Sequence, residues 1–355
     1  NRSSLMSDAP LPVRRSSSAA RAARQVILFH HWTMERLAKQ LVAHPLYAGR
    51  VRLGRCSWEC FADATPSIQI DPEDCMAMDT EEHDVAFLAS FAEPKLIFEQ
   101  LALLYAMPRM RARHFRVIVP YFSTGTMERV ERPGQVATAA TMARILSAVP
   151  SCPTGPSTIV IYDIHALQEQ FYFSDAVLVQ LKSAVYLLKQ AMAARADRGS
   201  ISVAFPDDGA AKRFKHLVKD YPHIVCIKVR DGDSRKVVVK DGEAAGRHCV
   251  ILDDLVQTGG TLIECAKALK EAGAGMVSCF VTHGVFPKES WRRFLGQEGA
   301  PPLFEKVWIT DSVPATVAAV TSDSDTNACL PPFEVLSLAP LIGNLITGDA
   351  PLEVE

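Results

Sequence analysis

From Gln25 onward, short runs of β-branched and other apolar residues alternate with stretches in which apolar residues recur at helical spacing. The first kind of run predicts strands at Val26–Phe29, Val85–Ser90, Arg116–Pro120, Thr158–Tyr162, Ser200–Phe205, Ile224–Val229, His248–Leu252, Met276–Thr282 and Val307–Thr310. The second kind predicts helices at Met34–Val42, Pro94–Tyr105, Val136–Ala148, Val177–Ala196, Ala211–Asp220, Thr261–Ala272 and Glu289–Phe294. Strands separated by helices need crossover connections, so the pattern predicts an α/β protein with mainly parallel sheets covered by helices on both faces.

The length of the chain indicates two domains. A chain of 355 residues exceeds what one hydrophobic core usually accommodates and favours two α/β domains of similar size. Residues 1–24 form a Ser-, Ala- and Arg-rich stretch without apolar periodicity, which predicts a disordered tail. The two domains are predicted at residues 25–176 and 177–337, with the Pro-flanked Gly155 as an alternative boundary. Residues 338–355 are predicted as a C-terminal helix and tail that could pack back on the N-terminal domain.

Composition limits the partners and the compartment. The formal net charge is −2, so the overall charge attracts neither nucleic acid nor an anionic membrane. The most apolar stretch, Asp84–Met107, is interrupted by charges and a proline and falls short of the ~18 apolar residues of a membrane span. The nine cysteines are scattered and form no Cys-x-x-Cys pair, which favours a reducing compartment such as the cytoplasm. The Arg-rich tail would also fit a peptide for import into an organelle.

The clearest chemical signal follows the predicted strand His248–Leu252. Two aspartates come first, and a Thr-Gly-Gly-Thr run then opens a helix. Glycines at a helix N-terminus let backbone N–H groups close around a phosphate, and adjacent carboxylates can accept hydrogen bonds from vicinal sugar hydroxyls. The alternative is an acidic capping turn with a flexible glycine pair. The whole string favours a ribose 5-phosphate site made of Asp253, Asp254, Gln257, Thr258, Gly259, Gly260 and Thr261.

This string resembles the motif shared by phosphoribosyltransferases and phosphoribosyl pyrophosphate synthetases. Further segments resemble the synthetases alone, which are also called ribose-phosphate diphosphokinases. These segments are Pro206–Arg213, Ile161–Ala166, Ile227–Arg230 and Thr282–Phe286. The resemblance runs from about Val26 to Ile346. It implies two similar phosphoribosyltransferase-like domains, of which the N-terminal one binds ATP and the C-terminal one binds ribose 5-phosphate.

The resemblance also implies roles for four side chains. Asp207 stands at a metal-ligand position in the loop that receives the diphosphate, and His165 at the position that helps to hold ATP-bound Mg²⁺. Lys228 and Arg230 match the Lys and Arg of the mobile catalytic loop. Simpler interpretations exist, namely a hydrogen-bonded structural histidine, a helix-capping aspartate and the solvated basic face of a strand. The joint placement of the four residues at the ends of separate predicted strands favours the site.

The chain departs from the common group of these synthetases at several positions. Phe61 and Asp63 match adenine contacts that a neighbouring subunit supplies in the family, which implies a homo-oligomer, but the glutamate of that motif is Thr65 here. An Arg-Gln pair that holds ATP in the common group is replaced by Thr126 and Met127, and neither residue can grip phosphate as arginine does. The sequence most resembles a plant-type group described as independent of phosphate activation.

The predicted function is the formation of phosphoribosyl pyrophosphate and AMP from ribose 5-phosphate and MgATP, with Mg²⁺ as the cofactor. A non-catalytic regulatory homologue is the first alternative, because the Arg-Gln pair is missing. A phosphoribosyltransferase would use the same ribose loop but would need neither the His165 segment nor the N-terminal half. A dinucleotide-binding dehydrogenase is excluded, since no Gly-x-Gly-x-x-Gly follows the first predicted strand.

Overall fold

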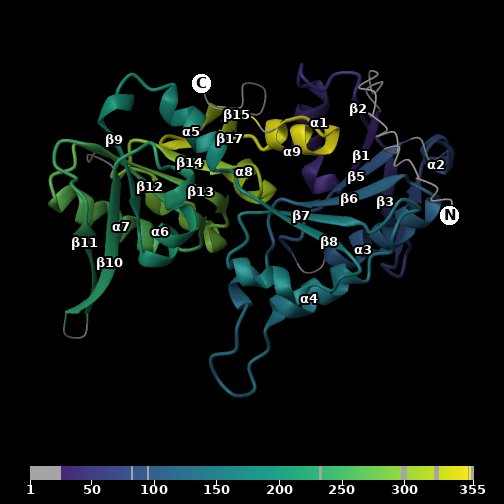
Figure 1. The fold of residues 1–355 in the computed structure, drawn as a ribbon, viewed down its shortest axis with the longest axis horizontal. Coiled ribbons are helices and arrows are strands. Elements are labelled where there is room, and N and C mark those ends of the chain that lie inside the picture. The colour runs from purple at the N-terminus through teal and green to yellow at the C-terminus, as the bar shows by residue number, and fades with distance from the viewer. Residues whose placement is uncertain are drawn as a thin grey trace, which may run out of the picture.

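The computed structural model of the chain describes residues 25–80, 83–93, 96–231, 234–296, 302–323, 328–350 and 352, with the backbone alone for 230, 231, 234 and 235. The predictions for the tail at 1–24 and for the Arg230 side chain lie outside these described residues. Two sheets stand side by side, one from each half of the chain (Figure 1). The predicted fold class, α/β with two mainly parallel sheets flanked by helices, is confirmed.

The N-terminal sheet has six parallel strands in the order β2-β1-β5-β6-β7-β8. They are β1 Val26–His30, β2 Val51–Leu53, β5 Asp84–Leu88, β6 His114–Val119, β7 Thr158–Tyr162 and β8 Leu178–Lys182. The helices of this half are α1 Glu35–Ala43, α2 Pro72–Asp79, α3 Ile97–Ala106 and α4 Thr138–Ser147. Neighbouring strand residues such as Leu28 and Phe29 belong to different buried clusters, so both faces of the sheet are packed, as a parallel sheet requires.

The C-terminal sheet has seven strands in the order β11-β10-β9-β12-β13-β14-β17, and only the β10–β11 pair is antiparallel. The strands are β9 Ile201–Phe205, β10 His223–Asp231, β11 Ser234–Asp241, β12 His248–Val256, β13 Met276–Gly284, β14 Val307–Thr310 and β17 Phe333–Leu336. The remaining α-helices are α5 Val185–Ala193, α6 Asp208–Phe214, α7 Gly260–Glu271, α8 Pro314–Val320 and α9 Ala339–Thr347. This order places β12, which leads into the predicted ribose 5-phosphate site, in the middle of the sheet.

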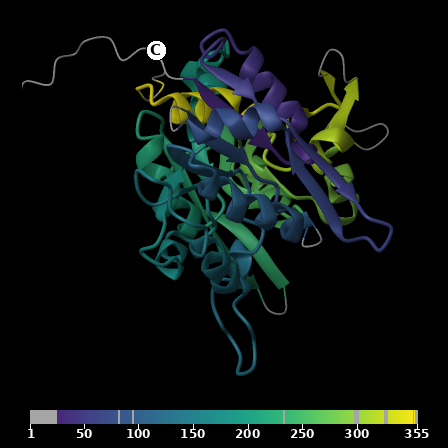
Figure 2. The same cartoon turned by 90° about the vertical axis from the view of Figure 1, so that its right-hand side faces the viewer.

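Smaller elements complete the fold. Two antiparallel hairpins are β3 Cys56–Cys60 with β4 Pro66–Ile70, and β15 Thr321–Asp323 with β16 Ala328–Cys329. The β3–β4 hairpin projects from the N-terminal half (Figure 2). Short 3₁₀-helices lie at Trp32–Met34, Met107–Met110, Gly125–Met127, Leu167–Tyr172, Arg198–Ser200, Lys215–Leu217 and Pro287–Phe294. Among the described helices, none is long and apolar enough to cross a bilayer.

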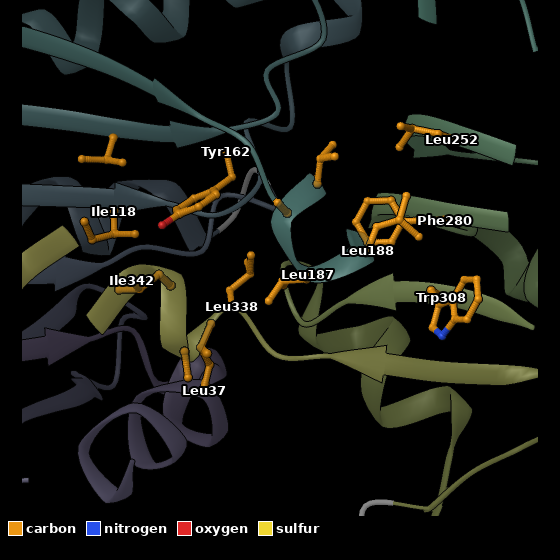
Figure 3. Close-up of a cluster of buried hydrophobic side chains, with 14 of the residues drawn as sticks. Leu37, Ile118, Tyr162, Leu187, Leu188, Leu252, Phe280, Trp308, Leu338 and Ile342 are labelled. Atoms are coloured by element: carbon orange, nitrogen blue, oxygen red, sulfur yellow. The ribbon is translucent and has the colours of Figure 1, made fainter. Parts of the chain in front are cut away.

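A shared hydrophobic core joins the two halves. Tyr162 at the end of β7 and Leu252 in β12 belong to the same buried cluster, with Leu188 of α5 also part of it (Figure 3). The last helix, α9, returns to the N-terminal half, where the Tyr47 hydroxyl donates to the Pro340 carbonyl at 2.7 Å. A Cβ atom at position 343 would lie 2.1 Å from the Tyr47 ring, so glycine is needed for this close approach. The packing fixes how the ends of the two sheets face each other.

The predicted helix Val177–Ala196 is wrong over its first part. Residues Leu178–Lys182 form β8, which pairs in parallel with β7, and only Val185–Ala193 form a helix. The pairing with β7 is a tertiary contact that overrides the local helical pattern. Since β8 completes the first sheet, a division of the chain by sheets would lie after Lys182, whereas the predicted boundary lies between residues 176 and 177.

Two further boundaries differ from the prediction. The helix predicted at Ala211–Asp220 begins at Asp208, because Asp207 caps it, and it ends at Phe214 before a 3₁₀ turn. The strand predicted at His248–Leu252 continues to Val256, because its pairing with β13 continues. Asp253 and Asp254 therefore lie in the last part of β12, where backbone hydrogen bonds to β13 fix the strand.

Candidate active site

A cleft of about 690 Å³ opens at the carboxyl ends of β9 and β12, beside the loop that follows β7. Ligands of parallel sheets usually bind at such strand ends. The walls come from both halves of the chain, and they include the predicted site residues His165, Asp207, Lys228, Asp253, Asp254 and Thr261. The fold thus brings together side chains that the sequence places after separate strands.

A second cavity of about 490 Å³ lies between α1 and α8. Its described walls are mainly apolar, and its charged lining residues are Glu35, Arg36, Glu93 and Asp311, so acids outnumber bases. A polyphosphate needs the opposite balance. The cleft at the ends of β9 and β12, which is lined by Arg129, Lys212, Arg213 and Lys228, is therefore the better candidate for a phosphate chemistry.

The predicted ribose-phosphate loop is a sharp turn between β12 and α7. Gly259 caps α7 with a φ of +80°, a conformation that favours glycine, and it lies against the buried Phe294 ring. The loop is also fixed from behind, because Ser290 Oγ donates to the Gln257 carbonyl at 2.8 Å and Arg293 donates to the Thr258 carbonyl. The first backbone N–H groups of α7 have no partner within the helix, and an anion is a suitable ligand for such groups.

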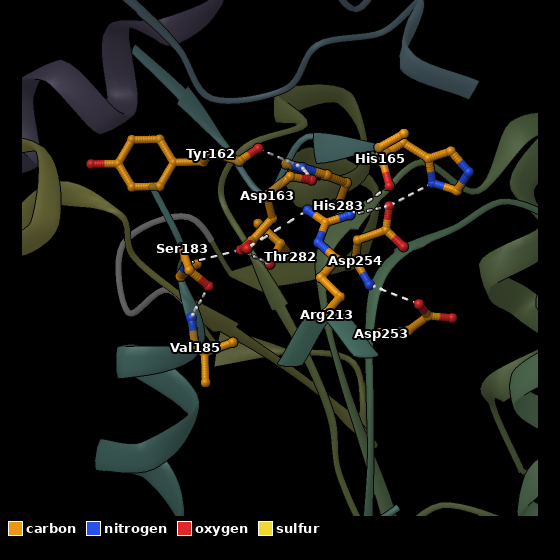
Figure 4. A network of polar contacts seen from close by, with 12 residues as sticks. Tyr162, Asp163, His165, Ser183, Val185, Arg213, Asp253, Asp254, Thr282 and His283 are labelled. Atoms are coloured by element: carbon orange, nitrogen blue, oxygen red, sulfur yellow. Dashed lines mark hydrogen bonds and ion pairs between the residues drawn. The ribbon is translucent and has the colours of Figure 1, made fainter. Parts of the chain in front are cut away.

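The two aspartates of β12 have different environments. Asp254 is buried, and its Oδ2 accepts a hydrogen bond from His165 Nδ1 at 2.8 Å (Figure 4). Burial raises the pKa of Asp254, but the hydrogen bond from His165 and the charge of Arg213 outweigh it and hold the pKa below its usual value. Burial and the adjacent Asp254 charge raise the pKa of Asp253 well above its usual value. The pair therefore resists carrying two negative charges and can bind a sugar diol through one charged and one protonatable carboxyl.

Arg213 connects the halves of the site, a role that the sequence did not reveal. Its Nη1 donates to the His165 carbonyl at 2.8 Å and lies 3.4 Å from Asp254 Oδ2, and its Nη2 lies 3.9 Å from Asp163 Oδ1. The side chain is only 13% exposed. One guanidinium therefore holds the loop after β7 against the carboxyl end of β12. Ion pairing over this sequence distance has no local sequence signal.

We expect Arg213→Met to lower kcat/KM for ribose 5-phosphate by about 10- to 100-fold, because a buried hydrogen bond to a charged group contributes about 1.5–3 kcal/mol. Steady-state kinetics measures the effect. Lys215→Met, a change at an exposed lysine on the following turn that is not among the described cleft residues, is the control. Arg213→Lys should recover only part of the loss, since an ammonium cannot span all three partners. Equal activity of Arg213→Met and the control would contradict the role.

A buried polar network holds the loop after β7 in place. Asp163 has a φ of +36°, and its Oδ2 accepts hydrogen bonds from Thr282 Oγ1 at 2.6 Å and from Ala184 N at 2.8 Å (Figure 4). The fully buried His283 places Nε2 3.1 Å from the Tyr162 carbonyl, which can only accept, so Nε2 carries the hydrogen. Burial lowers the pKa of His283, which favours this neutral form. The Thr282–Phe286 string thus serves to fix the neighbouring His165 loop.

Asp207 and Lys228 face each other across the cleft wall. Asp207 Oδ1 accepts from Ala210 N at 3.0 Å, so this residue caps α6 as the simpler interpretation expected, while Oδ2 lies 4.0 Å from Lys228 Nζ. Both side chains are nearly half exposed. The cap and the cleft position are compatible, because one carboxylate oxygen serves each. The backbone of Arg230 lies further along β10, and its side chain falls outside the described residues.

The cleft residues fit a magnesium ion that is shared with a phosphate ligand. Among the described residues, no group of three His, Cys, Asp or Glu side chains could hold a metal ion alone. Mg²⁺ usually binds through one or two carboxylates together with substrate phosphates and water, so an all-protein cage is not required. Asp207, whose side chain is nearly half exposed, offers the carboxylate oxygen that does not cap α6. His165 has its Nδ1 engaged with Asp254, which leaves Nε2 for a ligand.

Phe61 and Asp63 do not join the other predicted residues within one chain. They lie at the turn of the β3–β4 hairpin, where Asp63 Oδ1 accepts from Thr65 N at 3.0 Å, and the Phe61 side chain is 62% exposed. Neither is among the described residues that line the cleft, and the same holds for Thr126 and Met127. The sequence reasoning missed Arg129, which lines the cleft just beyond that pair.

Fold and site together define a protein of the phosphoribosyltransferase-like class, with two mainly parallel sheets and a glycine turn between β12 and α7. A family model described as the N-terminal domain of ribose phosphate pyrophosphokinase matches residues 26–149, and one described as a phosphoribosyl transferase domain matches residues 208–293. The chain belongs to the ribose-phosphate pyrophosphokinase family.

Individual relatives give the same picture. The chain is 48% identical over 333 residues to ribose-phosphate pyrophosphokinase 3, chloroplastic, of Oryza sativa subsp. japonica, with 93% of this chain and 78% of the relative covered. It is 47% identical over 324 residues to ribose-phosphate pyrophosphokinase 4 of Arabidopsis thaliana, with 91% and 92% covered. The crystal structure of phosphoribosylpyrophosphate synthetase from Mycobacterium smegmatis has the same fold, with a TM-score of 0.71, 23% identity and 91% and 97% of the two chains covered.

Proposed function

We infer that this protein is a ribose-phosphate pyrophosphokinase, which forms phosphoribosyl pyrophosphate and AMP from ribose 5-phosphate and ATP. The observation that carries this function is the identity of 46% to 48% with relatives of that name over nearly the whole chain. The cleft suits the reaction, because it combines a loop for a sugar phosphate with several cations for a polyphosphate.

In the proposed mechanism, the anomeric hydroxyl of ribose 5-phosphate attacks the β-phosphorus of ATP, and AMP leaves. Asp253 and Asp254 would bind the ribose hydroxyls, and the backbone N–H groups of Gln257–Thr261 would hold the 5-phosphate. Enzymes that transfer phosphoryl groups act mainly by positioning the reactants and stabilising charge. Burial of Asp254 and the fixed turn at Gly259 supply that positioning from the protein side.

The remaining predicted residues would act on the polyphosphate. Lys228 and Arg230, both on β10, would stabilise the charge that develops as the diphosphoryl group is transferred. His165 and Asp207 would hold Mg²⁺ on the polyphosphate, and the bound ion would neutralise part of the charge on the phosphate oxygens. The hydrogen bond between His165 and Asp254 would then link the metal position to the ribose position.

Three finer properties are proposals of their own. Similarity to the plant relatives supports activity that does not depend on added phosphate. The exposed Phe61 at a hairpin turn supports a homo-oligomer in which this turn completes the nucleotide site of a neighbouring subunit. A cytoplasmic location is supported by nine free cysteines, although relatives carry the names chloroplastic and mitochondrial.

The test of the function is the formation of AMP and phosphoribosyl pyrophosphate from ribose 5-phosphate and MgATP, measured with and without added inorganic phosphate. We expect equal rates in the two conditions. A requirement for phosphate would contradict the proposed independence of phosphate but not the proposed pyrophosphokinase activity. Absence of product in both conditions, while the folded protein still binds ribose 5-phosphate, would instead favour a non-catalytic regulatory homologue.

A further inference from the structure

Arg129 lies on the segment that leads from β6 to α4. It lines the same cleft as His165, Asp207 and Lys228. The segment before α4 extends toward the same side of the molecule as the β10–β11 hairpin, which carries Lys228, in both views (Figures 1 and 2). The cleft therefore receives cationic side chains from two projecting segments, one from each half of the chain.

The base of this segment is fixed against the site. Gly125 is buried, and a Cβ atom there would lie 3.4 Å from both the His165 Cβ and the Glu169 carboxylate. The Tyr172 hydroxyl donates to the Glu128 carbonyl, and the Glu128 side chain is only 10% exposed. Arg129 follows directly and is 71% exposed. The backbone that carries Arg129 is thus anchored next to His165, while its guanidinium is accessible to a ligand in the cleft.

The present partners of Arg129 are weak competitors for a phosphate. Its Nη2 lies 3.1 Å from Glu131 Oε1, and its Nε lies 3.6 Å from Glu128 Oε1. The pair with Glu131, whose side chain is 63% exposed, contributes little, about 0–1 kcal/mol, because water screens it. The contact with the buried Glu128 is longer than a hydrogen bond. A polyphosphate carries more charge and offers a bidentate geometry to the guanidinium, so exchange of partners is favoured when a nucleotide enters.

We propose that Arg129 binds the polyphosphate of the nucleotide substrate in the cleft that Lys228 also lines. The proposal rests on the proposed function, since it assigns a residue to the nucleotide part of that same site. Thr126 and Met127 are not among the described residues that line the cleft. Arg129 is the cation that the segment between β6 and α4 contributes to the described cleft lining. Because the contact is with phosphate and not with the base, it acts on all nucleoside triphosphates alike.

The test compares Arg129→Gln with the full-length wild-type protein in steady-state kinetics. We expect the KM for MgATP to rise about 10- to 100-fold, the range for a hydrogen-bonded contact between charged groups, while the KM for ribose 5-phosphate changes little. The KM for MgGTP, measured in the same way, should rise by the same factor. An unchanged KM for MgATP, or a rise confined to MgATP alone, would overturn the proposal.

Two control variants separate this contact from a structural effect of the substitution. Arg132→Gln removes another exposed cation of the same segment that is not among the described cleft residues, and it should leave the KM for MgATP near the wild-type value. Glu131→Gln removes the present partner of Arg129 and should not raise the KM for MgATP; a rise equal to that of Arg129→Gln would overturn the proposal.

Binding of the non-cleavable analogue α,β-methylene-ATP with Mg²⁺, measured by calorimetry on the same proteins, keeps the test independent of turnover. We expect Arg129→Gln to weaken this binding by the same factor as it raises the KM. Failure of the wild-type protein to form product would count against the proposed function, whereas equal analogue binding by wild type and Arg129→Gln would count against the role of Arg129.

Discussion

Lys228→Ala is expected to lower kcat by about 10²–10³-fold, the usual loss when one donor that stabilises a transition state is removed. Lys228 lines the same cleft as His165, and its Nζ lies 4.0 Å from Asp207 Oδ2. The ammonium can approach the transferred group only if it leaves Asp207, and a half-exposed pair at this distance is weak enough for that. Single-turnover measurements at saturating substrates would report the loss directly on the chemical step.

A matched control is available on the next strand. Lys240 of β11 is half exposed and pairs with Asp208 at 3.2 Å, a contact of the same kind that is not among the described walls of the cleft. Lys240→Ala should change kcat by less than about threefold. Exposed ion pairs contribute at most about 1 kcal/mol to stability, and Lys240 does not contact the reacting groups in the proposed mechanism. A loss below tenfold for Lys228→Ala, or similar losses for the two variants, would remove Lys228 from the catalytic role.

Much of the site could be predicted from the sequence because parallel strands end at one edge of their sheet. His165 follows β7 and Asp207 follows β9, while Asp254 lies at the end of β12, so residues that are far apart in sequence were expected to meet. The glycine pair could also be read locally, since a turn with positive φ before a helix has a strong sequence signature. These are features in which local sequence and global fold agree.

The parts that the sequence did not reveal depend on contacts between distant segments. The β8 strand was predicted as helix because its pairing with β7 has no local signal. Arg213 lies in a string that was noticed for other residues, and its contacts to His165 and Asp254 exist only once the two halves pack together. Arg129 lies in a connecting segment without a motif, and only the shape of the cleft shows its position.

Gly259→Ala is expected to destabilise the C-terminal half by about 2–6 kcal/mol and to weaken ribose 5-phosphate binding. Two costs add: about 1–3 kcal/mol for a non-glycine residue at a φ of +80°, and about 1–3 kcal/mol for overpacking. The new Cβ would lie 2.4 Å from the Phe294 ring, which cannot move freely because it is buried among Phe286, Phe304 and Phe333. Urea denaturation and calorimetric titration with ribose 5-phosphate would measure the two effects.

The next residue provides the control for this prediction. A Cβ at Gly260 would meet nothing closer than Thr258 Oγ1 at 3.9 Å, and its φ lies outside the positive region, so Gly260→Ala should change stability by less than about 1 kcal/mol. Adding Phe294→Leu to Gly259→Ala should restore part of the stability if the ring contact causes the loss, because the two sites are then coupled. Equal stability of Gly259→Ala and Gly260→Ala would show that the loop tolerates a side chain at position 259. The close packing of Gly259 against Phe294 would then not be the contact that fixes the backbone before α7.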